Sequence, residues 1–326
     1  MMKTKRFLFV SGVVLLAALC IGIMNLQYDR LSRYPYQDKQ ARAIIDEHLT
    51  DDEISYIIEY SIAPSEFLDY IDAPGFSIYH VAFYKQVRNS IWYLNNENIV
   101  YIVELAREKM TMDQLIDTLL NYDFDSVVRY LSESDKYIKG STLVENPTEL
   151  TAIVDDQHTL SSRILFDAIA IASLPSTTSD TVIASTVVVE PIKAMCIAIE
   201  AELDNGMTCG GLMVEHGYLT YDQQVALFEN ENNALEQDVP GHSEHQLGTS
   251  FDFVVKDVEA SKLSETVQYE WLQQNAHRFG FIESYPAGKE DVTQKDARPW
   301  HWRYVGYEMA ADLYFNQKTL FEGNHE

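Results

Sequence analysis

An aspartate inside an apolar segment is the feature that most restricts how this chain can fold. Residues 250–255 read Ser-Phe-Asp-Phe-Val-Val. Their alternation predicts a strand with Phe251 and Phe253 on one face and Asp252 on the other. Burying a carboxylate is costly unless it is paired or binds a metal ion. The fold must therefore bring partners to Asp252.

Two histidines are the candidate partners. His245 precedes a glycine turn just before this strand, and His301 alternates with tryptophans in a second predicted strand, residues 300–305. Two histidines and one carboxylate make a three-ligand zinc set that leaves the fourth position for water. Such water can be acidified and act as a nucleophile near neutral pH. By spacing alone, a hydrogen-bonded structural His/Asp pair remains the alternative.

The segments around these residues resemble the VanY-type D,D-carboxypeptidases, zinc peptidases that trim D-alanine from cell-wall peptides. Ser243, His245 and Asp252 meet the family pattern of Ser, any residue, His, then six residues to Asp. The run from Pro299 to Gly306, Pro-Trp-His-Trp-Arg-Tyr-Val-Gly, meets its closing pattern. The resemblance implies an α+β fold, with a C-terminal zinc-peptidase domain built on a small antiparallel sheet flanked by helices. It also implies zinc as cofactor, bound by His245, Asp252 and His301.

The same resemblance implies how a substrate is held. Its substrate would be a peptidoglycan stem peptide or a similar D-amino-acid peptide. The residues that it assigns to substrate binding are Ser243, Gln224 and Trp300. The family's substrate- and oxyanion-binding arginine is replaced here by Leu219. Loss of such an electrostatic stabiliser typically costs about 10²–10³-fold in rate.

A second departure concerns the proton acceptor. The family's general base is a glutamate three residues before the last ligand, where this chain has Arg298. A guanidinium cannot accept a proton, and losing a general base costs about 10²–10⁴-fold. Candidate substitute bases are Asp296, Glu283 and Glu308.

Two functions therefore compete. The first is a diverged metallocarboxypeptidase that acts on or binds D-Ala-D-Ala ends, with impaired catalysis. The second is an inactive pseudoenzyme that serves as a cell-wall-peptide or protein-binding module. A structural ectodomain without metal is a third, weaker alternative.

The N-terminus predicts where the chain resides. Lys3, Lys5 and Arg6 precede an uncharged run of 18 residues, Phe7–Met24. This is about the shortest length that spans a bilayer as a helix. The positive-inside bias predicts a single-pass cell-membrane protein whose C-terminal domain is extracellular. A cleaved signal peptide is the alternative, and it leaves the exterior placement unchanged.

Charge and cysteines add two expectations. The chain after residue 25 holds 21 basic and 50 acidic residues, a net charge of −29. This argues against nucleic acid as a partner, because phosphate binding needs a basic face. Cys196 and Cys209 would form either a disulfide or two buried free thiols.

The predicted organisation has six parts. They are a cytoplasmic tip and signal-anchor helix (1–25), a stalk (26–39), a helical domain (40–135), a connecting region (136–185), the zinc-carboxypeptidase domain (186–318) and a tail (319–326). Capping boxes at Thr50 and Thr111 predict helix starts. Further predictions are a helix over 190–203 and strands over 211–214, 250–255 and 300–305.

Overall fold

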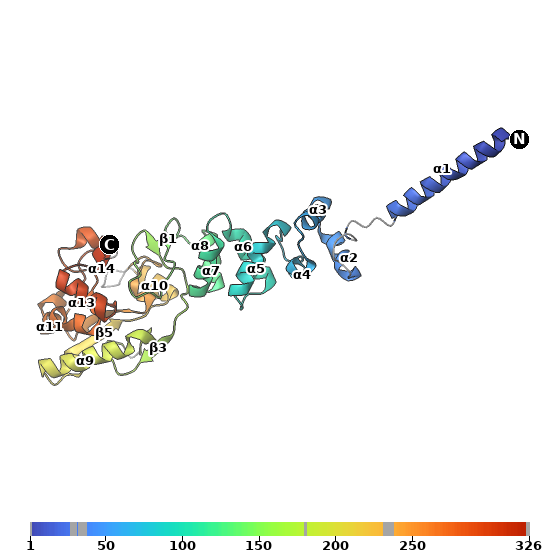
Figure 1. Ribbon diagram of the computed structural model, residues 1–326. Coiled ribbons are helices and arrows are strands. Elements are labelled where there is room, and N and C mark those ends of the chain that lie inside the picture. Colours follow the sequence, from blue (N-terminus) through green and yellow to red (C-terminus); the bar gives the residue numbers. More distant parts are fainter. Residues whose placement is uncertain (1, 27–30, 32–37, 179–180, 231–237, 324–326) are drawn as a thin grey trace. The chain divides into compact units, whose positions relative to one another are not determined.

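The computed structural model describes residues 2–26, 31, 38–178, 181–230 and 238–323 (Figure 1). Backbone contacts divide the chain into two compact units, residues 1–107 and 108–326. The predicted stalk lies mostly outside the described residues, and the predicted tail lies partly outside them.

The first unit is helical. Its helices are α1 (Met2–Leu26), α2 (Lys39–His48), α3 (Asp51–Glu59), α4 (Pro64–Phe67), α5 (Val81–Ser90) and α6 (Asn96–Ala106). The predicted capping box at Thr50 is confirmed, because Thr50 accepts from the Glu53 N–H and the Glu53 carboxylate accepts from the Thr50 N–H. Within the described residues, no helix is both long and apolar enough to cross a membrane. The predicted membrane-spanning helix is therefore not confirmed.

The second unit mixes helices and strands. Its elements are α7 (Met112–Asn121), α8 (Phe124–Leu131), β1 (Thr142–Leu143), β2 (His158–Thr159), β3 (Ala168–Ile171), β4 (Val182–Ser185), α9 (Val189–Leu203), β5 (Leu212–His216), α10 (Tyr221–Phe228), β6 (Ser250–Val255), α11 (Val267–Asn275), β7 (Phe281–Glu283), α12 (Glu290–Thr293), β8 (His301–Tyr304), α13 (Tyr307–Asn316) and α14 (Leu320–Gly323). The predicted α+β class is confirmed for this unit.

The division between the units places α7 and α8 in the second unit. Tyr122, which directly follows α7, ties these helices to later chain. Its hydroxyl donates to the carbonyl of Val144, and its backbone forms a β-bridge with Ile164. Thr111 caps α7 with a second capping box, as predicted.

A four-stranded antiparallel sheet in the order β5-β6-β8-β7 positions the candidate site. The strands predicted around 211–214, 250–255 and 300–305 are β5, β6 and β8, whereas the three-residue β7 was not predicted. Phe251 lies opposite Trp302, and both are buried in the core with residues of α9 and α11. Asp252 lies opposite His301, on the other face. The predicted alternation is confirmed, so one face builds the core and the other carries polar side chains.

A β-bulge sets which residue of β5 meets Asp252. The pairing of β5 with β6 is regular up to Val214, and it then slips by one residue, so that His216 lies opposite Asp252. Glu215 is the extra residue. Bulges of this kind re-aim the side chain that follows them. As a result, His216, Asp252 and His301 form a row across β5, β6 and β8.

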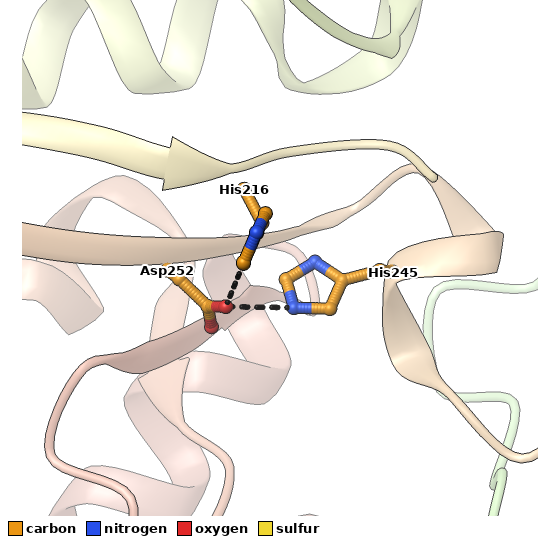
Figure 2. A group of neighbouring side chains, drawn as sticks. All are labelled: His216, His245 and Asp252. Carbon is orange, nitrogen blue, oxygen red and sulfur yellow. Dashed lines mark hydrogen bonds and ion pairs between the residues drawn. The ribbon is translucent and has the colours of Figure 1, made fainter. Parts of the chain in front are cut away.

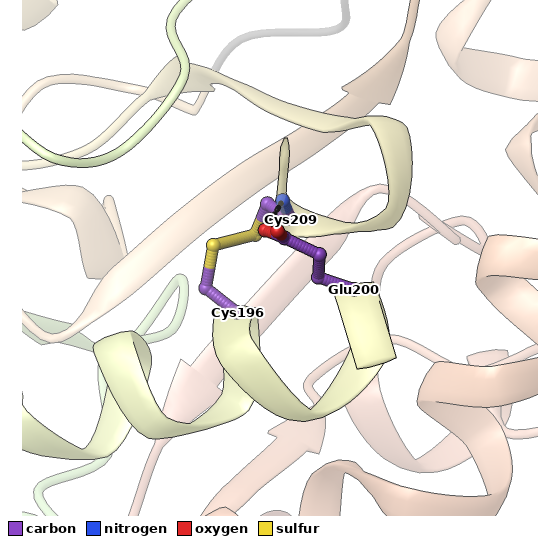
Figure 3. The surroundings of a disulfide bond; sticks show 3 residues. All are labelled: Cys196, Glu200 and Cys209. Carbon is purple, nitrogen blue, oxygen red and sulfur yellow. Dashed lines mark hydrogen bonds between the residues drawn. A yellow bond between two sulfur atoms is a disulfide. The ribbon is translucent and has the colours of Figure 1, made fainter. Parts of the chain in front are cut away.

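A disulfide joins Cys196 of α9 to Cys209, which resolves the alternative left open by the sequence (Figure 3). The Cα atoms are 4.4 Å apart, within the range that a disulfide spans. Glu200 accepts a hydrogen bond from the backbone N–H of Cys209 at 3.0 Å. The disulfide holds the turn that leads into β5 against α9.

Candidate metal centre

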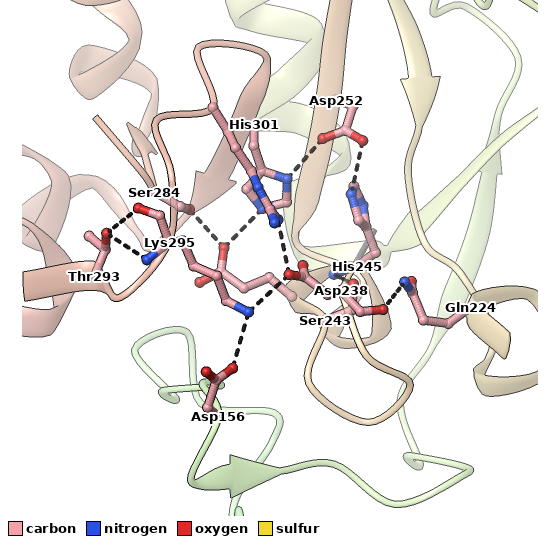
Figure 4. A network of polar contacts seen from close by, with 12 residues as sticks. Asp156, Gln224, Asp238, Ser243, His245, Asp252, Ser284, Thr293, Lys295 and His301 are labelled. Carbon is pink, nitrogen blue, oxygen red and sulfur yellow. Dashed lines mark hydrogen bonds and ion pairs between the residues drawn. The ribbon is translucent and has the colours of Figure 1, made fainter. Parts of the chain in front are cut away.

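Three imidazole rings converge on the carboxylate of Asp252. His216 Nδ1 and His245 Nε2 lie 3.0 and 3.1 Å from Asp252 Oδ2 (Figure 2). His301 Nδ1 lies 2.8 Å from the other oxygen, Oδ1 (Figure 4). The three predicted ligands, His245, Asp252 and His301, are therefore brought together. Their side chains are no more than 6 % exposed, and that of His216 is 16 % exposed.

The hydrogen bonds of His245 fix what its ring presents to Asp252. His245 Nδ1 lies 2.9 Å from the carbonyl oxygen of Gly217. A carbonyl oxygen only accepts, so Nδ1 carries the proton, and the neutral ring presents the lone pair of Nε2 to Asp252. Two acceptors in contact need positive charge, either a second proton on the ring or a metal ion. Metal-binding histidines have this arrangement, with the other ring N–H donated to a carbonyl or carboxylate.

His301 repeats the pattern with a different partner. Its Nε2 lies 3.0 Å from Glu244 Oε2 and its Nδ1 lies 2.8 Å from Asp252 Oδ1, and both carboxylates only accept. A neutral ring carries one N–H and can therefore donate to only one of them. Glu244 also accepts from Arg303 at 2.8 Å and from Ser284 at 2.7 Å. His245 and His301 each require added positive charge where they face the buried carboxylate of Asp252. A single divalent cation would supply it for both rings. The donor set therefore fits a metal ion.

The pKa shifts follow from this crowding of carboxylates and imidazoles. Burial alone would raise the pKa of Asp252, but His245 and the hydrogen bonds from all three rings hold it well below its usual value. Burial alone would lower the pKa of His301, but its bonds to Asp252 and Glu244 raise it to about 9. For Glu244, burial is outweighed chiefly by Arg303, and its pKa is also lowered. The site favours both carboxylates in their charged form.

His216 and Glu244 were missed from the sequence. Arg303 offered a signal for Glu244, because it shares a strand face with His301 and a buried guanidinium requires a buried acid. For His216 the signal was absent. Regular alternation from Val214 would put His216 on the same face as Val214, and only the bulge at Glu215 brings it to Asp252.

Arg298, at the position of the family's general base, is buried and paired. Its Nη1 donates to Asp238 at 3.0 Å, and its guanidinium lies over the ring of Tyr285 at 5.3 Å. Lys295 lies 3.2 Å from the same carboxylate of Asp238. The acid that pairs with Arg298 is thus Asp238, 60 residues earlier in the chain.

The predicted substrate-binding residues divide into two groups. Ser243, Gln224 and Leu219 are all buried, and two of them contact the backbone of His245: Ser243 Oγ accepts from its N–H at 3.4 Å, and the Leu219 N–H donates to its carbonyl at 3.3 Å. Gln224 donates to the carbonyl of Asp238 at 2.8 Å, and its buried Oε1 has no hydrogen-bond partner among the described residues. Trp300 forms the second group and has no contact with the cluster among the described hydrogen bonds. It lines a pocket with Met213 and Val254.

None of the three candidate substitute bases contacts the described cluster. Asp296 is exposed and lines a pocket of about 590 Å³ beside Arg298. Glu283 lies opposite Trp302 in the sheet, on the face away from His301, where Tyr269 and Gln273 donate to it. Glu308 is exposed on α13. Within the described cluster, Glu244 is the carboxylate besides Asp252, and its lowered pKa makes it a weak base.

The geometry defines a candidate metal centre on an antiparallel sheet of an α+β domain. Comparison with known proteins finds that residues 196–307 match the VanY family, described as D-alanyl-D-alanine carboxypeptidase. The resemblance stated from the motifs is confirmed.

Individual relatives and solved structures are similar to parts of this chain. "Putative carboxypeptidase YodJ" of Bacillus subtilis (strain 168) is 29 % identical over 226 residues, which is 66 % of this chain and 81 % of that protein. A D-alanyl-D-alanine carboxypeptidase of Enterococcus faecalis is 43 % identical over 84 residues, 26 % of this chain and 30 % of the relative. Among solved structures, the LdcB LD-carboxypeptidase, whose structure is described as revealing the basis of peptidoglycan recognition, is 29 % identical. It covers 56 % of this chain and 89 % of its own, with a TM-score of 0.49.

Proposed function

We propose that the second unit is a zinc-binding VanY-type domain that binds D-alanine-ended peptides of peptidoglycan and hydrolyses them only slowly. The observation that carries the proposal is the pairing of Arg298 with Asp238 beside an otherwise complete set of metal ligands. The ligands are those of a metallopeptidase, whereas the position that should hold the proton acceptor holds a buried cation.

Zinc is the ion that suits the donors. Imidazole nitrogens with one carboxylate are typical of zinc sites, and Glu244 and the Gly217 carbonyl supply the outer hydrogen bonds that orient such ligands. When bound, the ion supplies Lewis-acid polarisation of the peptide carbonyl. The chain's own residues would then hold the peptide. Gln224 Oε1 is a buried acceptor without a hydrogen-bond partner among the described residues, and Leu219 offers no side-chain donor to a terminal carboxylate.

Release of D-alanine by the zinc-loaded full-length protein tests the proposal. Two stem peptides are used: one ends in D-Ala-D-Ala, and in the other the terminal D-Ala follows an L-amino acid. Each is assayed with zinc and with a chelator, and peptide binding is measured in parallel. We expect binding of at least one peptide, with hydrolysis slower by about 10²–10⁴-fold than in an enzyme with a base. Rapid zinc-dependent release would overturn the impaired-catalysis part, and absence of binding to either peptide would overturn the ligand.

A set of variants separates the two missing groups. Leu219→Arg restores a clamp and Arg298→Glu restores an acceptor, so the double variant should exceed either single variant at least tenfold, since both act on one transition state. Arg298→Glu also places a second carboxylate beside Asp238, and adding Asp238→Asn removes this repulsion. Arg298→Gln, which has no acceptor of comparable basicity, is the matched control and should stay as slow as the wild type.

The second candidate is an inactive module that binds a cell-wall peptide or a protein. The fixed, buried position of Arg298 favours it, because breaking a buried ion pair typically costs about 3–5 kcal/mol. Peptide binding with no measurable release, even with zinc bound, would select this alternative.

We also propose that the domain works outside the cell, at the membrane surface. The support is the basic cluster Lys3, Lys5 and Arg6 before the uncharged run Phe7–Met24, together with the Cys196–Cys209 disulfide. Structural disulfides form and persist in oxidising compartments. Peptidoglycan is reached from that side.

A further inference from the structure

We propose that His216 is a fourth protein ligand of the metal ion, so that the site is closed by three histidines and one aspartate. The proposal rests on the zinc site proposed above and goes beyond it. With all four ligands bound, the ion has no coordination position left for water or substrate, so the slow hydrolysis proposed above requires one ligand to dissociate first.

The spacing of the donors supports His216 as strongly as it supports His245. Nitrogens from both rings lie on Asp252 Oδ2, at 3.0 and 3.1 Å, and the ligand atoms of these three residues lie within 4.8 Å of one another. Adjacent ligand atoms of a tetrahedral zinc ion, with bonds of about 2.0–2.1 Å, are about 3.3 Å apart. His216 therefore stands where a ligand would stand.

The rings also approach from different directions. The planes of His216 and His245 make an angle of 75°, and those of His245 and His301 an angle of 89°. His301 contacts Oδ1 of Asp252, whereas His216 and His245 contact Oδ2. Among the described residues, the ligand atoms of His216, His245 and Asp252 form a group within 4.8 Å of one another. His301 adds a donor at the other oxygen of the same carboxylate. Asp252 lies between the two flanking histidines of its row.

The backbone holds His216 in this place. The bulge at Glu215 puts it directly opposite Asp252, and directly opposite residues on neighbouring antiparallel strands have Cβ atoms about 4.5–5.5 Å apart. The side chain is mostly buried, so its position is not that of a surface residue that rotates freely.

A closed site agrees with the two other changes at this centre. Structural zinc sites are four-coordinate with protein ligands only, whereas catalytic sites keep three protein ligands and an open position. Arg298 provides no proton acceptor and Leu219 provides no clamp. With His216 bound as well, the ion would hold β5, β6 and β8 together around the peptide-binding face.

Cobalt in place of zinc tests the coordination directly. The full-length protein is loaded with Co²⁺, and its visible spectrum is recorded with and without azide, a small anionic ligand. We expect a four-coordinate spectrum that azide does not change. In His216→Ser the spectrum should respond to azide, and metal affinity should fall more than tenfold. His158→Ser is the matched control, because His158 pairs with Asp155 and should leave both readouts unchanged.

A ligand exchange guards against a variant that merely unfolds. In His216→Cys a coordinated thiolate should add a sulfur-to-cobalt charge-transfer band in the near ultraviolet. An azide-sensitive wild type, together with a His216→Cys spectrum that lacks this band, would overturn the fourth ligand and leave the zinc site standing. Absence of any cobalt or zinc binding by the wild type would overturn the zinc site and this proposal together.

A fully coordinated ion also predicts the relative activities of the variants in the rescue experiment. Adding His216→Ser to Leu219→Arg with Arg298→Glu should raise D-alanine release at least tenfold above the double variant. If the triple variant is no faster while its cobalt spectrum has become azide-sensitive, the shell was closed but was not what limited turnover. Azide sensitivity alone decides the coordination.

Discussion

Glu283 is a mostly buried carboxylate on the face of the sheet away from the candidate metal centre. Tyr269 donates to it at 3.0 Å, and Gln273 also donates to it. Burial raises its pKa to about 7, although these hydrogen bonds oppose the shift. Although a pKa near neutrality suits a general base, Glu283 lies away from the candidate metal centre. We therefore expect its ionisation to affect the free energy of unfolding.

We expect Glu283→Gln to stabilise the protein above neutral pH. A raised pKa in the folded state means that folding is favoured while the group is protonated, so stability falls as pH rises from about 4.5 to about 7 and is then constant. The gain should approach about 3 kcal/mol at alkaline pH and vanish at acid pH. Urea unfolding across this range checks it.

Glu308→Gln, at an exposed carboxylate, is the control and should give no pH-dependent difference. A Glu283→Gln variant that is equally destabilised at every pH would show that the charged form is not strained in the wild type.

At the scale of elements, the disulfide fixes the position of the turn from which β5 begins. It joins α9 to the turn before the strand, across 13 positions of sequence. Since β5 carries His216, the bond stabilises the strand whose register decides what faces Asp252. The packing of Cys196 and Cys209 in the same core as Phe251 and Trp302 connects it to the rest of the sheet.

Replacing Cys196 and Cys209 by serine should lower the free energy of unfolding by about 3 kcal/mol, the amount expected for a closed loop of about this length. Denaturant unfolding of the wild type with and without reductant should show the same difference. Cys20, the free cysteine among those described, is unaffected by the change. If the unfolded, unreduced wild type contains three reactive thiols, the bond is absent and the prediction is wrong.

Local patterns predicted the elements that depend on local chemistry. Alternation placed Asp252 and His301 on one face, and the capping boxes at Thr50 and Thr111 marked real helix starts. The rest depends on contacts that no local pattern encodes. Alternation assumes an unbroken strand, so the bulge before His216 was invisible, and Asp238 is paired with Arg298 only through the fold.

At the scale of the whole molecule, the predicted topology places the acidic chain after residue 25 outside the cell. Protease added outside intact cells should digest the chain beyond the stalk and leave the first six residues protected. The check is immunoblotting with tags at the two ends. A mature protein that starts after residue 25 would identify a cleaved signal instead, and protection of the C-terminal tag would contradict the exterior location.

The matched VanY domain, residues 196–307, is not a self-contained part of this chain. Arg303 lies inside it and bonds Glu244, the residue that orients His301. The other end of the same guanidinium donates to the carbonyls of Leu150 and Ala152, both outside the matched range. A fragment cut at the family boundary would leave two donors of a fully buried cation unbonded. Loss of metal by such a fragment would reflect where it was cut and not what its ligands can bind.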